Sequence, residues 1–536
     1  MPRPVTRRGA AALAWAATWP AATQASATDE LRIGLAAGPT SFDPHYHAHA
    51  PSYALHRHVF ETLLTREHDG RLIPTLAEDW SPLPTGDGWE FRLDPAARFA
   101  DGAPVIAADV AASIHRVLTV PASPGRWTPF LADLAHVELV DRLTLRLRTY
   151  GPAPLLPNVL PAVLVVPEAL ARSATTAEFN SGTAAVGSGP YRLRRYIAGT
   201  EVVLERSPTW WQRDRLGPEP WSTVTFRVIT TSPSRVAALL AGNVDFIEGV
   251  PPGDVAALRR RSDIAISRAN SLRLVYIALS QGASAPEGLS DHAGRPLARN
   301  PLQDVRVRRA LSLAIDRAAI VAQVMDGEAL PAAQVQPEGF AGFDMDLRPP
   351  ALDRDEARRL LAEAGWSQGF RIRLSGTNDR LVNDERILQA VAQMWQRVGI
   401  TTEVEPLPST VFFPRFNAGA LAAGLTSWSG SSGEPNTFFV AVLSGRNATR
   451  GRGTANPTGY GNAQVDALVD RALGEVDVGA RHAGWREAQR IALSQDAAVI
   501  PLHHQVNLWA MRRTLSYDAR IDELTYATGV RPTSSR

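Results

Sequence analysis

The chain of 536 residues contains no cysteine. This absence excludes a thiol nucleophile, a disulfide, a zinc site with cysteine ligands and an iron–sulfur cluster. It also excludes a lipid-anchored N-terminal cysteine, so we do not expect a lipoprotein. The function therefore does not depend on thiol chemistry.

Lysine is absent as well, and all 56 basic residues are arginine. Without lysine there is no Walker A lysine, no Schiff base and no Ser–Lys pair, so ATP hydrolysis by the P-loop route is not expected. The 54 acidic residues nearly balance the arginines. A near-neutral protein gives no electrostatic basis for binding nucleic acid or an anionic membrane.

Long apolar runs are also missing beyond the N-terminal region, so no membrane span is expected. Residues 1–27 have the three parts of a secretory signal. A basic region, an apolar region and a cleavage motif follow in order: Arg3, Arg7 and Arg8, then residues 9–17, then Ala25-Ser26-Ala27. We therefore expect a soluble periplasmic protein, exported by the general secretory or the twin-arginine route.

Residues 77–116 predict a small unit of strands followed by a helix. Turn residues at 84–88 separate two extended segments, and apolar side chains alternate with charged ones along the second segment. A helix is expected near Asp109, where apolar residues begin to recur at helical spacing. No metal-binding or catalytic pattern occurs here, so the residues alone predict only a mixed unit of strands and a helix.

This unit resembles the signature region of the family 5 (peptide/nickel type) extracellular solute-binding proteins of ABC importers. Other stretches resemble the same family in the same order. The matching motifs are Ala77-Glu78 with Trp80, Trp89-Glu90-Phe91-Arg92-Leu93, Phe99 with Asp101-Gly102, Ala108-Asp109-Val110, Gly187-Ser188-Gly189-Pro190-Tyr191, Trp210-Trp211, residues 238–245, 304–310, 314–317 and 360–365, Val398-Gly399-Ile400 and Tyr460-Gly461-Asn462. The resemblance implies a solute-binding protein that is not an enzyme and needs no cofactor.

The sequence also predicts two helices outside this unit. The segment 304–324 predicts one long helix, because Asp304 can cap it and apolar residues recur at i, i+3, i+4 and i+7. Its basic face, which includes Arg308, is expected in solvent or paired with acids. A second helix is expected at about residues 51–64.

Five of the twelve histidines fall between residues 45 and 58. His45, His47 and His49 alternate, so an extended chain would place them on one face. Neutral imidazoles in a row can bind a transition metal, but no further ligand is spaced to complete a site. We favour a polar loop here and keep a nickel or metal-chelate site as an alternative. The resemblance places the loop near the ligand cleft, which makes His45, Tyr46 and His47 candidate ligand contacts.

The loop that begins at Trp428 is the most informative one for the ligand. A bulky aromatic residue among small polar ones is typical of a chain that lines a ligand. In peptide-binding members of the resembled family, an aspartate of this loop pairs with the peptide ammonium, and here that position is Ser431. A buried ammonium without a counter-ion is costly, so Glu434 would have to supply the charge. Arg380 and Arg386 lie where the resemblance places an arginine for the ligand carboxylate.

The length predicts about two to four domains. The resemblance implies an α/β fold of the large, two-lobed periplasmic-binding-protein type, with crossing segments near residues 270–278 and 500–508. The expected division is a signal peptide at 1–27, a first lobe at 28–270 with an extra subdomain at about 46–180, a second lobe at 271–505 and a return to the first lobe at 506–536.

These observations predict a monomeric periplasmic component of an ABC importer. It would capture an oligopeptide or related small molecule between its lobes, close on it and deliver it to a membrane permease. A sensory receptor is an alternative that the sequence does not separate from import. A secreted hydrolase is another, although the chain has no G-x-S-x-G or H-E-x-x-H motif.

Overall fold

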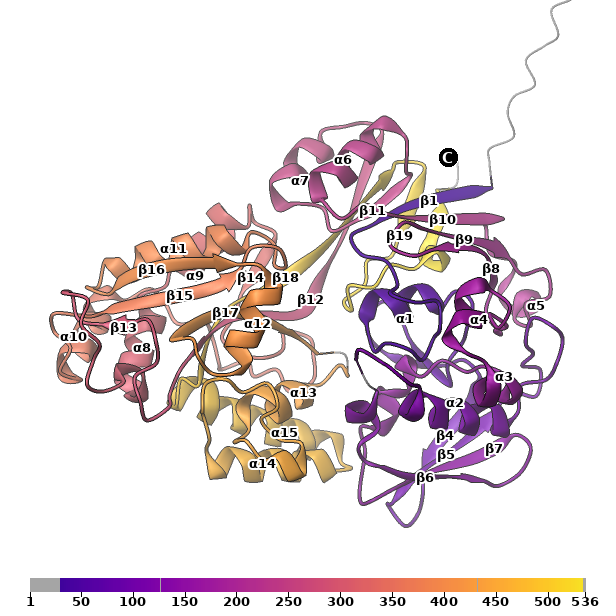
Figure 1. Cartoon of the computed structure of the whole chain (residues 1–536), viewed down its shortest axis with the longest axis horizontal. Helices are drawn as coiled ribbons and strands as arrows, with labels where there is room; N and C mark the ends of the chain where they lie inside the picture. Colours follow the sequence, from indigo (N-terminus) through magenta and orange to yellow (C-terminus); the bar gives the residue numbers. More distant parts are fainter. Residues whose placement is uncertain (1–28, 126, 431, 534–536) are drawn as a thin grey trace, which may run out of the picture.

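The computed structural model describes residues 29–533, apart from residues 126 and 431 (Figure 1). The predicted signal peptide, residues 1–27, lies outside the described part of the chain. Figure 1 shows two bodies joined by two long strands, β12 (Ile264–Leu279) and β18 (Val499–Arg512). We call the body that contains β1 to β11 and the segment after β18 the first lobe. The body formed between β12 and β18 is the second lobe.

Within the described residues, a mixed sheet of twelve strands extends through both lobes. Its first-lobe strands are β1 (Glu30–Leu35), β8 (Tyr191–Ile197), β9 (Glu201–Arg206), β10 (Thr223–Val228) and β11 (Phe246–Glu248). Its second-lobe strands are β13 (Leu289–Ser290), β14 (Ala329–Pro331), β15 (Arg371–Thr377), β16 (Thr401–Leu407) and β17 (Ala423–Ser429). The order is β13-β15-β17-β12-β18-β11-β1-β10-β9-β8, with β14 on β18 and β16 on β15. The crossing strands therefore lie in the middle of the sheet.

The segment with the family motifs forms a second, antiparallel sheet in the first lobe. Its order is β4-β5-β7-β6, and the pairing of β4 with β5 confirms the two extended segments predicted on either side of residues 84–88. The strands are β4 (Ala77–Pro82), β5 (Gly88–Leu93), β6 (Leu134–Leu139) and β7 (Thr144–Thr149). Phe91 and Leu93 of β5 share a buried cluster with Val110 and Ile114 of α2 (Ala107–Thr119), whereas Arg92 is exposed. The alternation read from the sequence therefore buries one face of this sheet against a helix.

The remaining elements are short strands and helices that surround the two sheets. The strands are β2 (Leu64–Arg66), β3 (Leu72–Pro74), β19 (Leu515–Tyr517) and β20 (Val530–Pro532). The helices are α1 (Ala50–His56), α3 (Glu168–Ser173), α4 (Thr176–Ser181), α5 (Arg213–Leu216), α6 (Ser232–Ala241), α7 (Pro252–Arg259), α8 (Val305–Leu313), α9 (Arg317–Ala319), α10 (Arg354–Glu363), α11 (Asp384–Gln396), α12 (Ser409–Asn417), α13 (Asn436–Phe438), α14 (Ala463–Gly474) and α15 (Val478–Gln489). In the described part of the chain, no helix has the length and apolar character needed to cross a bilayer.

The helix expected over residues 51–64 is wrong in its length, because α1 ends at His56. The carbonyls of His58 and Val59 instead accept hydrogen bonds from the backbone N–H groups of Tyr191 and Gly189, each at 2.9 Å. A Cβ atom at Gly187 would lie 1.9 Å from the Val59 carbonyl oxygen. The Gly-Ser-Gly-Pro-Tyr motif thus lets two chain segments approach closely, and this pairing replaces the second half of the expected helix.

The single helix expected over residues 304–324 is also wrong. It breaks after Leu313, and α9 then leads into a π-helical turn at Ile320–Val324. Asp316 caps the second part by accepting a hydrogen bond from Ala319 at 2.9 Å. The break accompanies the burial of Arg317, whose guanidinium donates to the carbonyls of Ser312 and Pro501.

The basic face of this segment is only partly as expected. Arg306 pairs with Asp304 at 2.6 Å. Arg308, by contrast, is buried and donates to the carbonyls of Leu302, Gln303, Asp496 and Ala497. The expectation of a solvated or acid-paired Arg308 is therefore wrong, because backbone carbonyls satisfy its guanidinium instead.

Glu61 is a buried carboxylate between α1 and β2. Its two oxygens accept hydrogen bonds from the indole N–H groups of Trp210 at 3.2 Å and Trp211 at 2.7 Å. Burial raises the pKa of Glu61 to about 7, although these hydrogen bonds act in the opposite direction. The folded protein therefore favours the protonated form more strongly than the unfolded chain does.

Because the pKa of Glu61 is raised in the folded protein, its contribution to the unfolding free energy should fall as the pH rises. The unfolded chain loses the Glu61 proton from about pH 4.3 upward, whereas the folded protein holds it until about pH 7. Relative to Glu61→Gln, the wild type should lose about 3 kcal/mol of unfolding free energy between these pH values and little above them. Urea unfolding of both proteins across the range measures the difference, and a constant difference would contradict the prediction.

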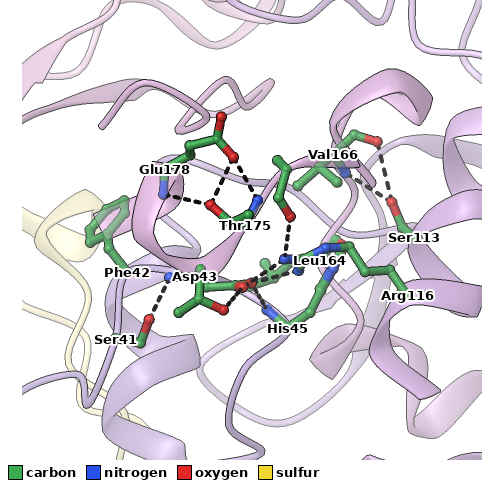
Figure 2. A network of polar contacts seen from close by, with 12 residues as sticks. Ser41, Phe42, Asp43, His45, Ser113, Arg116, Leu164, Val166, Thr175 and Glu178 are labelled. Atoms are coloured by element: carbon green, nitrogen blue, oxygen red, sulfur yellow. Dashed lines mark hydrogen bonds and ion pairs between the residues drawn. The ribbon is translucent and has the colours of Figure 1, made fainter. Parts of the chain in front are cut away.

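Asp43 anchors the loop that follows β1 to the helices of the first lobe (Figure 2). Both of its oxygens accept hydrogen bonds from the guanidinium of Arg116 at 2.6 Å, and both side chains are buried. The His45 backbone N–H donates to Asp43 at 3.0 Å, and the Thr176 hydroxyl donates at 2.8 Å. Arg116 also stacks on Phe179, with its guanidinium carbon 4.7 Å from the ring centroid. One carboxylate thereby joins the loop, α2 and α4.

Removal of this carboxylate should be strongly destabilising, because it leaves the Arg116 charge buried without a counter-ion. We expect Asp43→Ala to lower the unfolding free energy by about 3–5 kcal/mol. The matched control is Asp355→Ala, which breaks an ion pair with Arg358 whose acid is 95% exposed, and it should cost less than about 1 kcal/mol. Chemical denaturation measures both, and equal effects would show that burial does not govern the Asp43 pair.

Candidate ligand-binding cleft

A cavity of about 680 Å³ lies between the two lobes. The first lobe contributes Tyr53, Arg57, Arg66 and Trp127, among others, and β18 contributes residues 505–509. The second lobe contributes Arg380, Val382, Ser429 and Gly430. Most of the wall is apolar, with a small number of charged groups, which is the usual character of a small-molecule site.

One ion pair at the cavity wall ties the second-lobe end of β12 to the segment after β18. Arg273 donates to the carboxylate of Glu523, with a shortest distance of 2.6 Å. The Ser271 hydroxyl donates to the same carboxylate at 2.6 Å. Arg273 also donates to Ser427 of β17 at 3.0 Å, so its Nε, Nη1 and Nη2 atoms each have an acceptor.

Arg380 differs from Arg273, because its guanidinium has no hydrogen bond or ion pair to any described residue. It stacks on Phe413 with the guanidinium carbon 4.7 Å from the ring centroid. Desolvation by the surrounding wall lowers the pKa of Arg380, and the nearby charge of Arg273 acts in the same direction. Its five N–H donors are thus available to a ligand in the cavity.

Arg386, the other arginine expected at the ligand carboxylate, does not line the cavity. Its exposed guanidinium donates to the Gln323 carbonyl at 2.9 Å and lies 3.9 Å from Asp326. The two arginines are six positions apart, and only Arg380 precedes α11. The helix begins between them and directs Arg386 to the outside of the second lobe.

The loop after Trp428 reaches the cavity through smaller residues than expected. Trp428 itself does not line the cavity, and its indole N–H donates to the Thr437 hydroxyl at 3.1 Å. Ser429 and Gly430 do line it. Ser431 lies outside the described residues.

Glu434 is not free to bind a ligand ammonium. It is buried, and its carboxylate accepts hydrogen bonds from the Arg481 guanidinium at 3.0 Å and from the Trp485 indole N–H at 2.9 Å. It does not line the cavity. The role considered for Glu434 is therefore corrected, since two donors of α15 already satisfy its carboxylate.

The histidine segment does not form a row of ligands. His45 is buried and its Nε2 atom bonds to the Leu164 carbonyl at 2.7 Å, and burial lowers its pKa to about 4. His47 and His49 are partly exposed and stack on each other, with ring centroids 4.9 Å apart. Tyr46 lies beside a different surface hollow. The shared face required an extended chain, and this condition is not met, because the chain turns between His45 and His47.

No group of three or more histidine or carboxylate side chains in the described residues is placed to hold a metal ion. Neither His45, Tyr46 nor His47 lines the main cavity. The nickel alternative, which depended on these histidines, is therefore not favoured.

Sequence reasoning did not single out six charged residues of the cavity wall, namely Arg57, Arg66, Glu248, Arg273, Asp522 and Glu523. No local pattern marks them, because they are isolated members of a set of 56 arginines and 54 acids. They meet only because the segment after β18 returns to the cleft.

Comparison with known proteins gives the family and the fold. The model of the bacterial extracellular solute-binding proteins, family 5 Middle, matches residues 71–450. The periplasmic murein peptide-binding protein MppA of Escherichia coli (strain K12) is 25% identical over 519 residues, which are 92% of this chain and 91% of MppA. The glutathione-binding protein GsiB of Salmonella paratyphi A is 25% identical over 506 residues, 93% of each chain.

Among solved structures, the periplasmic binding protein DppA from Helicobacter pylori, in complex with the peptide STSA, superposes with a TM-score of 0.75. It is 19% identical and covers 94% of this chain and 98% of its own. At this identity the likeness concerns the fold alone, and it confirms the expected α/β periplasmic-binding-protein class. Because the family model spans more than half of the chain, the protein belongs to the family 5 bacterial extracellular solute-binding proteins.

Proposed function

We propose that this protein captures an oligopeptide or a related small molecule between its lobes and delivers it to the membrane permease of an ABC importer. It acts by binding and without turnover, as a monomer in the periplasm. The observation that carries the proposal is the Arg380 guanidinium in the wall of the cavity between the lobes, which has no hydrogen bond or ion pair to any residue that the structure describes. The names of the relatives, a murein peptide-binding and a glutathione-binding protein, support a peptide-like ligand.

Arg380 fits the carboxylate of such a ligand. A guanidinium and a carboxylate form paired, charge-assisted hydrogen bonds of defined geometry. The apolar wall, which includes Tyr53, Trp127 and Val382, would receive side chains. The first lobe and the second lobe would thus each contact a different part of the ligand.

The crossing strands are suited to serve as the hinge. The register of β12 against β18 shifts between Asn270 and Leu274 and again between Val275 and Tyr276. Such irregularities interrupt ladder hydrogen bonds and allow a local change of twist. We place the boundary between the lobes at these positions on β12, near residue 270, and near residue 505 on β18.

Closure then follows from differential affinity. A ligand that contacts both lobes binds the closed form more tightly and shifts the equilibrium towards it. The lobes contact each other in the structure, since Arg66 of the first lobe donates to the Ser432 carbonyl of the second at 3.1 Å. The permease would recognise the surface that forms when the lobes come together.

Protein purified from a periplasm tests the proposal directly. Native mass spectrometry should show a retained small molecule, and a peptide library should contain members that raise the melting temperature. Small-angle X-ray scattering should show a more compact protein when such a peptide is added. If no peptide or retained molecule produces any of these effects, the proposed function is wrong.

The role of Arg380 gives a sharper prediction. Loss of a charge-assisted hydrogen bond costs about 1.5–3 kcal/mol, so Arg380→Gln should weaken a bound free-acid peptide by roughly 10- to 150-fold. Amidation of the peptide C-terminus should weaken binding to the wild type and change little in the variant. Calorimetry measures both, with Arg386→Gln as the matched control outside the cavity. An equal response of the two variants would remove Arg380 from the site.

A further inference from the structure

The first-lobe wall of the cavity contains two arginines that have no carboxylate partner among the described residues. Arg57 donates to the Tyr526 hydroxyl at 3.0 Å and to the Thr65 hydroxyl. Arg66 donates only to backbone carbonyls, of Gly70, Asn158 and Ser432. Both residues line the cavity, and no described carboxylate lies within ion-pair distance of either guanidinium. Neutral acceptors hold them in place but do not balance their charge.

The acids of the same wall do not offset these charges, because each has its own donors. Asp522 pairs with Arg520 at 2.6 Å, and Glu523 pairs with Arg273 at 2.6 Å. Glu248 is the third acid and has no arginine within ion-pair distance in the described residues.

Glu248 accepts hydrogen bonds only from neutral donors, the Ala36 N–H at 2.8 Å and the Thr525 hydroxyl at 2.5 Å. Burial raises the pKa of Glu248, which disfavours its negative charge. Together with Arg380, the cavity wall therefore carries three guanidinia that have no ion-pair partner among the described residues.

Positive charges held close together in the cavity wall repel one another, and an anionic ligand would reduce this repulsion. Desolvation lowers the pKa of Arg66 to about 10, and the charges of Arg57 and Arg520 add to this effect while Asp522 opposes it. Because these charges are partly desolvated, a ligand that neutralises them should bind with the largest gain in binding free energy. The sequence is consistent with an anionic ligand, since the loop residue Ser431 has no negative charge that could pair with a ligand ammonium.

We propose that Arg57 and Arg66 form a second anion-binding subsite, on the first-lobe wall of the cavity whose second-lobe wall carries Arg380. The ligand is then a peptide-like molecule with at least two carboxylates, one for each lobe. This inference rests on the proposed function and narrows its substrate class. Because Arg66 also contacts the second lobe through Ser432, an anion at this subsite would favour the closed form as well as bind.

The wild-type protein tests the inference through the charge of the ligand. Calorimetry is carried out with Ala-Ala-Ala and with tripeptides that carry one Glu or one Lys at each position, at low and at high salt. At least one Glu peptide should bind about tenfold or more tightly than Ala-Ala-Ala, and the Lys peptides should bind more weakly. The Glu preference should shrink as salt screens the charges.

Two variants assign the preference to the subsite. In Arg57→Gln and Arg66→Gln, the ratio of Glu-peptide to Ala-Ala-Ala affinity should fall to within a few-fold of one, whereas Arg386→Gln should keep the wild-type ratio. The ratio is the readout because a change in lobe packing alters both affinities together, whereas loss of the subsite alters only one. An unchanged ratio in both cavity variants would overturn the assignment.

The outcomes separate this inference from the proposed function when succinate and glutarate are added to the ligand set. Tripeptides that bind with no preference for Glu would overturn the subsite and leave peptide capture standing. Dicarboxylates that bind while every tripeptide fails would support the subsite and overturn peptide capture. If neither class binds, both proposals fall.

Discussion

The pairing of β12 with β18 is the interaction on which the rest of the structure depends. Their ladder extends from the pair Ile264 and Arg512 in the first lobe to the pair Ala278 and Val499 in the second. Each lobe completes its part of the large sheet on these strands, through β11 at one end and β17 at the other. The cavity lies beside the point where the ladder is irregular, so the candidate site and the proposed hinge share the same backbone.

Arginine carries out several structural tasks in this lysine-free chain. Arg308 and Arg317 are buried and donate to backbone carbonyls, so they join helices to strand ends without an ion pair. Arg116 and Arg273 pair with acids from distant segments. The planar guanidinium suits both tasks, because its five donors reach several acceptors at once. Arg57, Arg66 and Arg380 differ from these arginines, because they line the cavity and have no ion-pair partner among the described residues.

Local sequence patterns predicted local structure well, but they did not predict contacts between residues that are far apart in the sequence. The hairpin of β4 and β5 follows from alternation, which depends only on neighbouring residues. The helix expected over residues 304–324 failed because Arg317 turns inward to reach a carbonyl of β18, nearly two hundred positions away. Of the expected ligand contacts, Arg380 lines the cavity, whereas Glu434 accepts hydrogen bonds from side chains of α15. Helical spacing and loop composition contain no information on such distant partners.

The return of the chain after β18 has a consequence for the order in which the protein is made. The wall of the cavity begins with Leu35 and is completed by Thr525. A ribosome must therefore have synthesised almost the whole chain before the cleft can form, and contacts of such large sequence separation form slowly. Under the proposed function, an unfinished chain could not yet sequester solute, because the last segment of the cavity wall would be missing.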